Sequence, residues 1–501
     1  MSVGKPFGLP ANWSWATVGD LVSRIEAGSS FRCLERPPEP GEPAIIKISA
    51  VTWGEFRPDQ SKVVLERERL DPADRVIAGD FLFSRANTLE LVGACVIACP
   101  HEQELYLSDK ILRFRFAGEF KAWLLWWLRT PEGRRAIQES SSGNQLSMRN
   151  IGQQAIQALP VPFPPLPEQR RIVERIEALL AKGARAKAAL DAIPALLDRY
   201  RQSLLAAAFR GDLTAEWRDR NPDTVSADAL VARNAPPVQP RGGREATDAV
   251  ILGRAALSVN HPGTEVPPGW SWTPLLRIAR QETGHTPTRA KPEYWDGDVP
   301  WIGIRDAGAH HGQVIMDTAQ HVTELGLENS SARLLPAGTV CLSRTASVGY
   351  VTIMGRAMAT SQDFATWTCT PALLPKFLMY ALMAEGEDIR RFGEGTTHTT
   401  IYFPEIRALN ICLAPLDEQH EIVRLVEDGL ARIDRIAAAV SSATDRHTTL
   451  TQSILAKAFR GELVPQDPAD EPASVLLDRI RSQRAATPDR PRRGRRASAA
   501  S

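Results

Sequence analysis

The chain has few cysteines and no long hydrophobic run, and both absences exclude classes of protein. Its six cysteines among 501 residues show no paired spacing of the kind that indicates a disulfide framework or a zinc site. The apolar runs, such as residues 122–128, have at most eight residues, whereas a membrane span needs about 20. The N-terminal sequence MSVGKPFGLPANW lacks the basic-then-apolar order of a signal peptide. These features predict a cytoplasmic protein that binds no metal.

An excess of basic charge is also missing, because 60 Lys and Arg residues are balanced by 59 Asp and Glu residues. Nucleic-acid-binding domains usually carry a basic patch, so any DNA-binding surface must be local. The sequence contains no GxxxxGK[ST] phosphate loop, no GxGxxG fingerprint, no HExxH zinc motif and no GxSxG nucleophile motif. The absence of catalytic motifs favours a binding protein or a scaffold over an enzyme.

What the sequence does contain is an internal repeat. Residues 165–213 align without a gap with residues 415–463, at an offset of 250 residues. Both copies begin with PLxEQ and end with QS(L/I)LAxAFRG(D/E)L, and between these ends apolar or small residues recur at alternating spacings of four and three. This heptad pattern indicates long helices that pair. We predict two helices, each about 60 Å long at 1.5 Å per residue, which form an antiparallel coiled coil with Gly183 and Gly429 permitting close approach.

A looser repeat precedes each helix. The triplet WSW occurs at residues 13–15 and 270–272, and AGDFLFSR at residues 78–85 corresponds to AGTVCLSR at residues 337–344. Strand-like runs, an amphipathic helix and a polar loop follow in the same order in both halves, which predicts two mixed α/β domains. The predicted organisation is a first α/β (mixed α+β) domain over 1–164, its helix over 165–213, a linker over 214–265, a second domain over 266–414, its helix over 415–463, and a C-terminal extension with a basic, disordered tail over 464–501.

With these repeated motifs the chain resembles the specificity subunit of type I restriction-modification enzymes, and the likeness covers nearly all of its length. The resemblance implies two target-recognition domains that each read half of a bipartite, asymmetric sequence in double-stranded DNA, with the paired helices fixing the unread spacer. It also implies two methyltransferase subunits docked on the helices, joined by restriction (nuclease-translocase) subunits. S-adenosylmethionine, ATP and Mg would then be bound by the partner subunits, and no cofactor by this chain.

Two other functions stay open at this point. A structural adaptor would gather partners through its coiled coil irrespective of DNA sequence, although the divergence of the polar loops GNQLSMRN (143–150) and GTTHTTIY (395–402) argues against it. An enzyme with a novel site, such as a solo nuclease or methyltransferase, would show turnover by the isolated chain.

The candidate DNA-contacting residues follow from side-chain chemistry, because Arg and Lys suit guanine and phosphate, Asn and Gln suit adenine, and Ser and Thr suit either. A Ser-Arg pair follows a predicted strand in both domains, polar loops precede both long helices, and the strand ILRFRF places two arginines on one face. Lys47 and Arg305 lie near comparable strand ends. The candidates are Lys47, Ser84, Arg85, Asn87, Arg113, Arg115, Asn144, Gln145, Arg149, Asn150, Arg305, Ser343, Arg344, Thr345, His398, Thr399 and Thr400.

These candidates have structural alternatives. The arginines of the two Ser-Arg pairs would instead form ion pairs with local carboxylates such as Asp80 or Asp363. The polar loops would be solvated connections capped by their own side chains, and the arginines of ILRFRF would lie on an ordinary solvated strand face. The tryptophans of the WSW triplets are predicted to anchor the domain cores.

Overall fold

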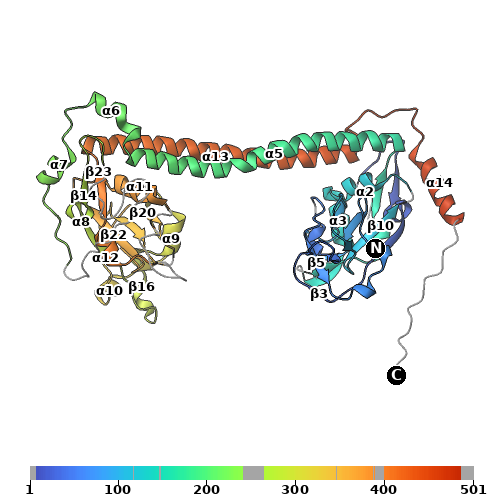
Figure 1. The fold of residues 1–501 in the computed structure, drawn as a ribbon, viewed down its shortest axis with the longest axis horizontal. Helices are drawn as coiled ribbons and strands as arrows, with labels where there is room; N and C mark the ends of the chain where they lie inside the picture. Colours follow the sequence, from blue (N-terminus) through green and yellow to red (C-terminus); the bar gives the residue numbers. More distant parts are fainter. Residues whose placement is uncertain are drawn as a thin grey trace, which may run out of the picture. The chain divides into compact units, whose positions relative to one another are not determined.

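The computed structural model describes residues 7–52, 54–116, 118–145, 148–240, 265–345, 347–386, 389 and 400–486. The chain divides into two compact units, which we call unit 1 (1–190 with 442–501) and unit 2 (191–441). Each unit contains one globular domain and parts of two long helices, α5 (Leu166–Phe209) and α13 (Leu416–Phe459) (Figure 1). Each domain is therefore combined with the start of one helix and the end of the other.

Unit 1 is built on an antiparallel sheet with the strand order β2-β10-β6-β8. Phe81, Phe83 and Phe114 stack on one face of it, with ring centroids 5.1–5.2 Å apart, under the helices that follow. Smaller sheets have the orders β3-β5-β4-β9, β11-β12-β7 and β1-β13. The strands are β1 (Ser14–Thr17), β2 (Val22–Ala27), β3 (Cys33–Leu34), β4 (Ala44–Ile46), β5 (Ser61–Val64), β6 (Phe81–Ser84), β7 (Ala86–Asn87), β8 (Cys95–Ile97), β9 (Leu105–Tyr106), β10 (Ile111–Phe116), β11 (Ser142–Gln145), β12 (Met148–Asn150) and β13 (Pro160–Phe163). The helices are α1 (Val18–Leu21), α2 (Lys121–Leu128), α3 (Pro131–Ser140), α4 (Gln153–Gln157) and α14 (Ala473–Ala486), with short 3-10 turns η1 (Ile48–Ala50), η2 (Arg67–Arg69) and η3 (Pro72–Asp74).

Unit 2 repeats this plan around a five-stranded sheet with the order β15-β22-β19-β20-β17. Val340, Leu342 and Trp367 of this sheet are fully buried in one core with the helix α11. The other sheets are β18-β16-β21 and β14-β23. The strands are β14 (Ser271–Pro274), β15 (Ala279–Thr283), β16 (Trp295–Ile302), β17 (Val314–Ile315), β18 (His321–Val322), β19 (Val340–Ser343), β20 (Val351–Met354), β21 (Ala359–Thr360), β22 (Phe364–Cys369) and β23 (Asn410–Leu413). The helices are α6 (Ala215–Arg220), α7 (Ala227–Arg233), α8 (Leu275–Ile278), α9 (Ile304–Ala309), α10 (Glu324–Glu328), α11 (Pro375–Glu385) and α12 (Phe403–Arg407), with turns η4 (Asp212–Thr214) and η5 (Pro292–Tyr294).

The two domains share one unusually close backbone approach. A Cβ added at Gly28 would collide with the carbonyl group of Leu107, and a Cβ added at Gly284 would collide with that of Thr360. Both glycines follow the strand at the edge of the main sheet, β2 or β15, at the same point of the fold. Glycine is required at both places because a side chain would push the two segments apart.

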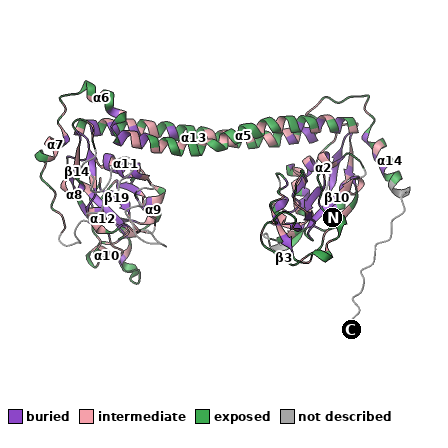
Figure 2. Ribbon diagram, viewed as in Figure 1, coloured by how far each residue is buried: buried purple, intermediate pink, exposed green. Residues whose placement is uncertain are grey.

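The long helices pair antiparallel in each unit, as the heptads predicted. Gly183 faces His447 in unit 1, and Gly429 faces Leu204 in unit 2, so residue numbers rise along one helix while they fall along the other. Figure 2 shows long exposed stretches on both helices, with buried residues gathered in the domains. Within the described ranges, no helix is both long and apolar enough to cross a bilayer. The predicted fold, two α/β domains with paired long helices, is confirmed.

The phenylalanine of each AFRG motif packs into a domain far from it in the sequence. Phe459 lies in the core of unit 1, with its ring 4.5 Å from Trp123 and 5.3 Å from Trp127. Phe209 lies in the core of unit 2, with its ring 5.0 Å from Phe377. Each domain is therefore completed by the end of the helix that begins at the other domain.

Part of the segment predicted as a linker, residues 214–240, contains helices that pack on unit 2. Helix α7 packs on unit 2, where Ala227 is fully buried and its amide donates to the carbonyl of Gly269. Helix α14 takes the matching place on unit 1, where Ala473 is buried and donates to Asn12. The sequence did not predict these helices, because a few buried residues within a polar segment give little periodicity. Residues 241–264 and 487–501 lie outside the described residues.

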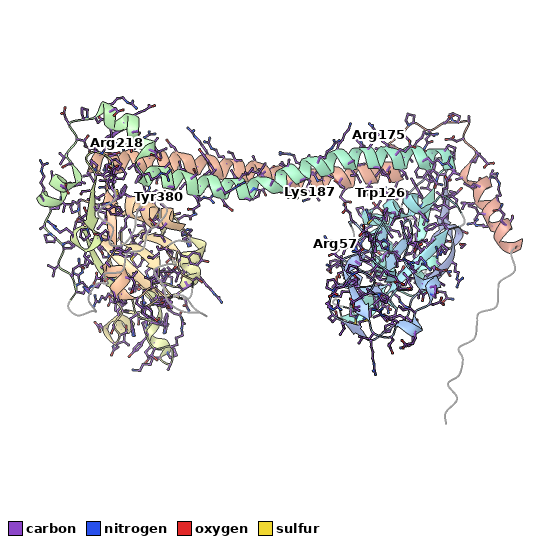
Figure 3. The ribbon with its side chains drawn as sticks, viewed as in Figure 1. Arg57, Trp126, Arg175, Lys187, Arg218 and Tyr380 are labelled. Atoms are coloured by element: carbon purple, nitrogen blue, oxygen red, sulfur yellow. The ribbon has the colours of Figure 1, made fainter. Side chains whose placement is uncertain are left out.

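The glutamate of each PLxEQ motif anchors its helix to the WSW triplet. Trp13 Nε1 donates to Glu168 at 3.1 Å, and Trp270 Nε1 donates to Glu418 at 2.8 Å. Both carboxylates are fully buried. Glu418 also accepts from Thr214, at 2.6 Å, and from Arg218, which projects from α6 (Figure 3). The WSW tryptophans are core anchors, as predicted.

We expect the two glutamates to respond differently to neutralisation. The positions 250 residues after Thr214 and Arg218 are Val464 and Pro468, which carry no side-chain donor, and burial raises the pKa of Glu168. Because the pKa is raised in the folded state, the charged Glu168 carboxylate lowers the free energy of unfolding at pH values above its unfolded-state pKa. This loss of stability disappears as the pH falls and the carboxylate becomes protonated.

Glu168→Gln should therefore leave the free energy of unfolding of unit 1 equal to that of wild type or slightly higher at pH 7. The difference between variant and wild type should shrink as the pH is lowered. Glu418→Gln should destabilise unit 2 by about 1–3 kcal/mol, because it removes the carboxylate opposite Arg218. Urea unfolding followed by hydrogen exchange in each unit measures both effects. Equal losses of stability in the two variants would contradict this account.

Candidate nucleic-acid interface

The Ser-Arg pair of the first domain ties the main sheet to the loop that precedes the long helix. The amide of Arg85 donates to the carbonyl of Lys110, and its carbonyl accepts from the amide of Ile151. The Arg85 guanidinium lies 3.4 Å from Oδ1 of Asn150. Ser84 itself is fully buried at the end of β6. The serine therefore belongs to the core, whereas the half-buried Arg85 lies at the surface.

A small three-stranded ribbon, β11-β12-β7, carries the amide side chains of this region. Asn87 pairs with Arg149 across β7 and β12, and Asn150 is exposed beside them. Arg149 donates to the carbonyl oxygens of Gly143 and Ser141, at 2.8 and 2.6 Å, so it shapes the loop. The backbones of Asn144 and Gln145 form part of β11, but their side chains lie outside the described residues.

The same domain contains a hollow of about 370 Å³, which we call the lysine hollow. Lys47, Lys62 and Lys110 line it. The hydroxyl-bearing residues Ser30, Ser49 and Ser108 line it too. Ammonium and hydroxyl groups are the donors that bind phosphate oxygens in protein–DNA complexes. The backbone amide of Arg85 donates a hydrogen bond to the carbonyl of Lys110, so the hollow adjoins the ribbon. We call the hollow and the ribbon together the first interface.

The exposed arginine face predicted for ILRFRF is wrong for Arg113, whose side chain is 2% exposed. Its guanidinium lies 2.6 Å from Glu26 and 3.2 Å from Asp80, both on neighbouring strands or loops of the same domain. Arg115 is 41% exposed and joins the same two carboxylates, each at 3.2 Å. The alternation rule placed both arginines on one face correctly, but that face is covered by the segment before β6. A DNA contact by Arg113 would first require this cluster to open.

The second domain uses its Ser-Arg pair in the same way. The amide of Arg344 donates to the carbonyl of Asp363, and its carbonyl accepts from Ile401. Its guanidinium donates to the carbonyls of Ile401 and Gln362, at 3.3 and 2.9 Å, and lies 4.5 Å from the ring of Phe403. Burial lowers the pKa of Arg344. This arginine holds the pre-helix loop to the sheet.

Other candidates of the second domain differ in accessibility. Ser343 is fully buried and its hydroxyl accepts from the amide of Tyr350. Thr345 and Thr400 are half-buried, and Arg305 is exposed on α9. His398 and Thr399 lie outside the described residues.

The guanidinium groups of the two Ser-Arg arginines contact groups other than the carboxylates of Asp80 and Asp363, which the sequence offered as alternative partners. Asp80 is bound by Arg113 and Arg115, and Arg85 reaches Asn150. In the second domain the guanidinium of Arg344 donates to backbone oxygens. In both domains the arginine is thus a connector between the sheet and the pre-helix loop.

Sequence reasoning missed two lysines of the lysine hollow and the glutamate that pairs with Lys47 and Lys62. Lys62 lies in β5, and Lys110 precedes β10. Glu35 carries a carboxylate within 3.3 Å of Lys47 and 3.1 Å of Lys62. No signal in the sequence joins these residues, because strand pairing across long separations brings them together.

The chain is similar to known proteins over nearly all of its length. Residues 271–438 match the family described as the type I restriction modification DNA specificity domain. The chain is 25% identical to the type I restriction enzyme EcoBI specificity subunit of Escherichia coli, over 95% of this chain and 93% of that one. It is 26% identical to the EcoKI specificity subunit of Escherichia coli strain K12, over 97% and 98% of the two chains.

Two solved structures share the fold. One comes from work on complex assembly and conformational transition of the type I R-M system, and matches with a TM-score of 0.65 at 19% identity, over 91% of this chain and 100% of that one. The other is the HsdS subunit from Thermoanaerobacter tengcongensis, with a TM-score of 0.52 at 18% identity, over 91% and 99%.

Proposed function

We propose that the chain is a type I restriction-modification specificity subunit, and that it reads a bipartite, asymmetric sequence in double-stranded DNA. As a DNA-recognition component it is not an enzyme. The observation that carries the bipartite proposal is the internal repeat: one fold occurs twice, with different side chains at the places that would meet bases. The first domain offers Asn87, Asn150 and Arg85 there, and the second offers Arg305, Thr345 and Thr400.

The asymmetry of the target follows from this divergence. Amides suit adenine, whereas hydroxyls bind either phosphates or bases, so the two surfaces differ in the base edges that they fit. Two half-sites read by different side chains are different sequences. We propose further that α5 and α13, each of 44 residues, fix the number of unread base pairs between the half-sites.

The same proposal extends to partners and location. Two methyltransferase subunits would dock on the paired helices, whose long exposed stretches leave room for them, and restriction subunits would join these. S-adenosylmethionine, ATP and Mg would be bound by those subunits, and the chain itself would bind no cofactor. We propose that the complex works in the cytoplasm, where the DNA is.

Methylome sequencing tests the proposal directly. A host expressing the chain with its methyltransferase subunit is compared with the same host lacking the chain. We expect a methylated motif with two different half-sites and a fixed gap, which disappears with the chain. An unchanged methylome, with the complex shown to be assembled, would favour the structural adaptor.

A further inference from the structure

Two lysines of the lysine hollow are paired with a carboxylate that is not among the residues lining the hollow. Glu35 follows β3, and its side chain is 69% exposed. It lies between Lys47 and Lys62, whose side chains are 33% and 29% exposed. The two lysines in the wall of the hollow are thus paired with a carboxylate that is more exposed than they are.

A carboxylate and a phosphodiester offer the same chemistry to ammonium groups, because each presents two oxygens that share one negative charge. Hydrogen bonds from Lys62 and then from Lys47 lower the pKa of Glu35, so its carboxylate stays charged. Lys110 also lines the hollow and is exposed. Three lysines and one carboxylate, that of Asp109, line the hollow, so it has room and a net positive charge for an anion that replaces Glu35.

We propose that Glu35 is a placeholder for a phosphate of the DNA backbone. In the DNA-free chain its carboxylate holds Lys47 and Lys62 in place, and on binding a phosphodiester displaces it. The lysines stay paired throughout, and the displaced side chain moves into solvent. This inference rests on the proposed DNA-reading function, and it adds a residue that weakens binding to DNA of every sequence.

Removing the placeholder should strengthen binding. We expect Glu35→Gln to tighten binding to target and scrambled duplexes by the same factor, about 2- to 10-fold, because two exposed ion pairs no longer compete with the DNA. The factor is the same for both duplexes because phosphate contacts carry no sequence information. The target duplex is the one identified by the methylome.

The experiment is fluorescence anisotropy of the assembled complex with both duplexes, at several salt concentrations. The matched control is Glu471→Gln, which removes an exposed carboxylate paired with Arg479 elsewhere in unit 1 and should bind like wild type. Lys47→Ala with Lys62→Ala should reduce the slope of log K against log salt by about 0.9 for each phosphate that the lysines no longer neutralise. In that background Glu35→Gln should have no further effect.

Each outcome decides the proposal. Glu35→Gln binding that equals the Glu471→Gln control, or is weaker than wild type, shows that the ion pairs are structural and overturns the placeholder. Thermal unfolding near that of wild type checks that all variants fold. If the wild-type complex does not prefer its target duplex, the DNA-reading function fails separately, while the scrambled duplex still tests Glu35.

Discussion

Replacing Phe459 with alanine should unfold the N-terminal domain far more easily, although this residue lies in the second long helix, far along the chain from that domain. Phe459 is 1% exposed and packs against Trp123 and Trp127 in the core of unit 1. Truncating a buried phenylalanine costs about 3–5 kcal/mol, because apolar burial is reduced and a cavity is left behind. Hydrogen exchange with peptide resolution should show reduced protection in residues 8–163 and little change in residues 266–414.

Two variants serve as controls for this effect. Phe209→Ala removes the equivalent ring, which packs on Phe377. It should reduce the hydrogen-exchange protection of unit 2 and leave that of unit 1 unchanged. Leu450→Ala alters the same helix as Phe459 at a site that is 58% exposed, and should change the free energy of unfolding by no more than about 0.5 kcal/mol. Reduced protection in unit 2 alone after Phe459→Ala would disprove the crossed packing.

A second large loss of stability is expected for Arg113→Ala. The guanidinium joins Glu26 and Asp80 and also donates to the carbonyl of Arg75 at 2.7 Å. Without the Arg113 guanidinium, the carboxylate of Asp80, which is 4% exposed, stays buried with Arg115 as its remaining cationic partner. Breaking a buried pair by removing one partner costs about 3–5 kcal/mol, so the urea midpoint of unit 1 should fall sharply.

Arg115→Ala is the matched control for this prediction. Arg115 bonds the same two carboxylates, but its side chain is 41% exposed, and exposed pairs contribute about 0.2–1 kcal/mol. We therefore expect a loss of stability several times smaller than that of Arg113→Ala. Similar effects in both variants would show that burial does not decide the strength of this cluster. A DNA-binding defect in folded Arg113→Ala would return this residue to the interface.

The features that the sequence predicted correctly are repetitive or local. The heptads predicted the two paired helices, because a 3.5-residue apolar period indicates a seam whatever lies around it. The repeated WSW and Ser-Arg motifs predicted that one domain plan occurs twice. Short helices such as α7 and α14 were missed, because a few buried residues within a polar segment give little periodicity.

The sequence by itself therefore determined the two long helices, the order of the repeated motifs and the duplication of the domain plan, since these depend on neighbours a few residues apart. Tertiary structure decided which residues meet. It put Phe459 into the N-terminal domain, covered Arg113, and gathered Lys47, Lys62 and Lys110 around one hollow. These contacts depend on strand register and on the antiparallel pairing of distant segments, which no local period specifies.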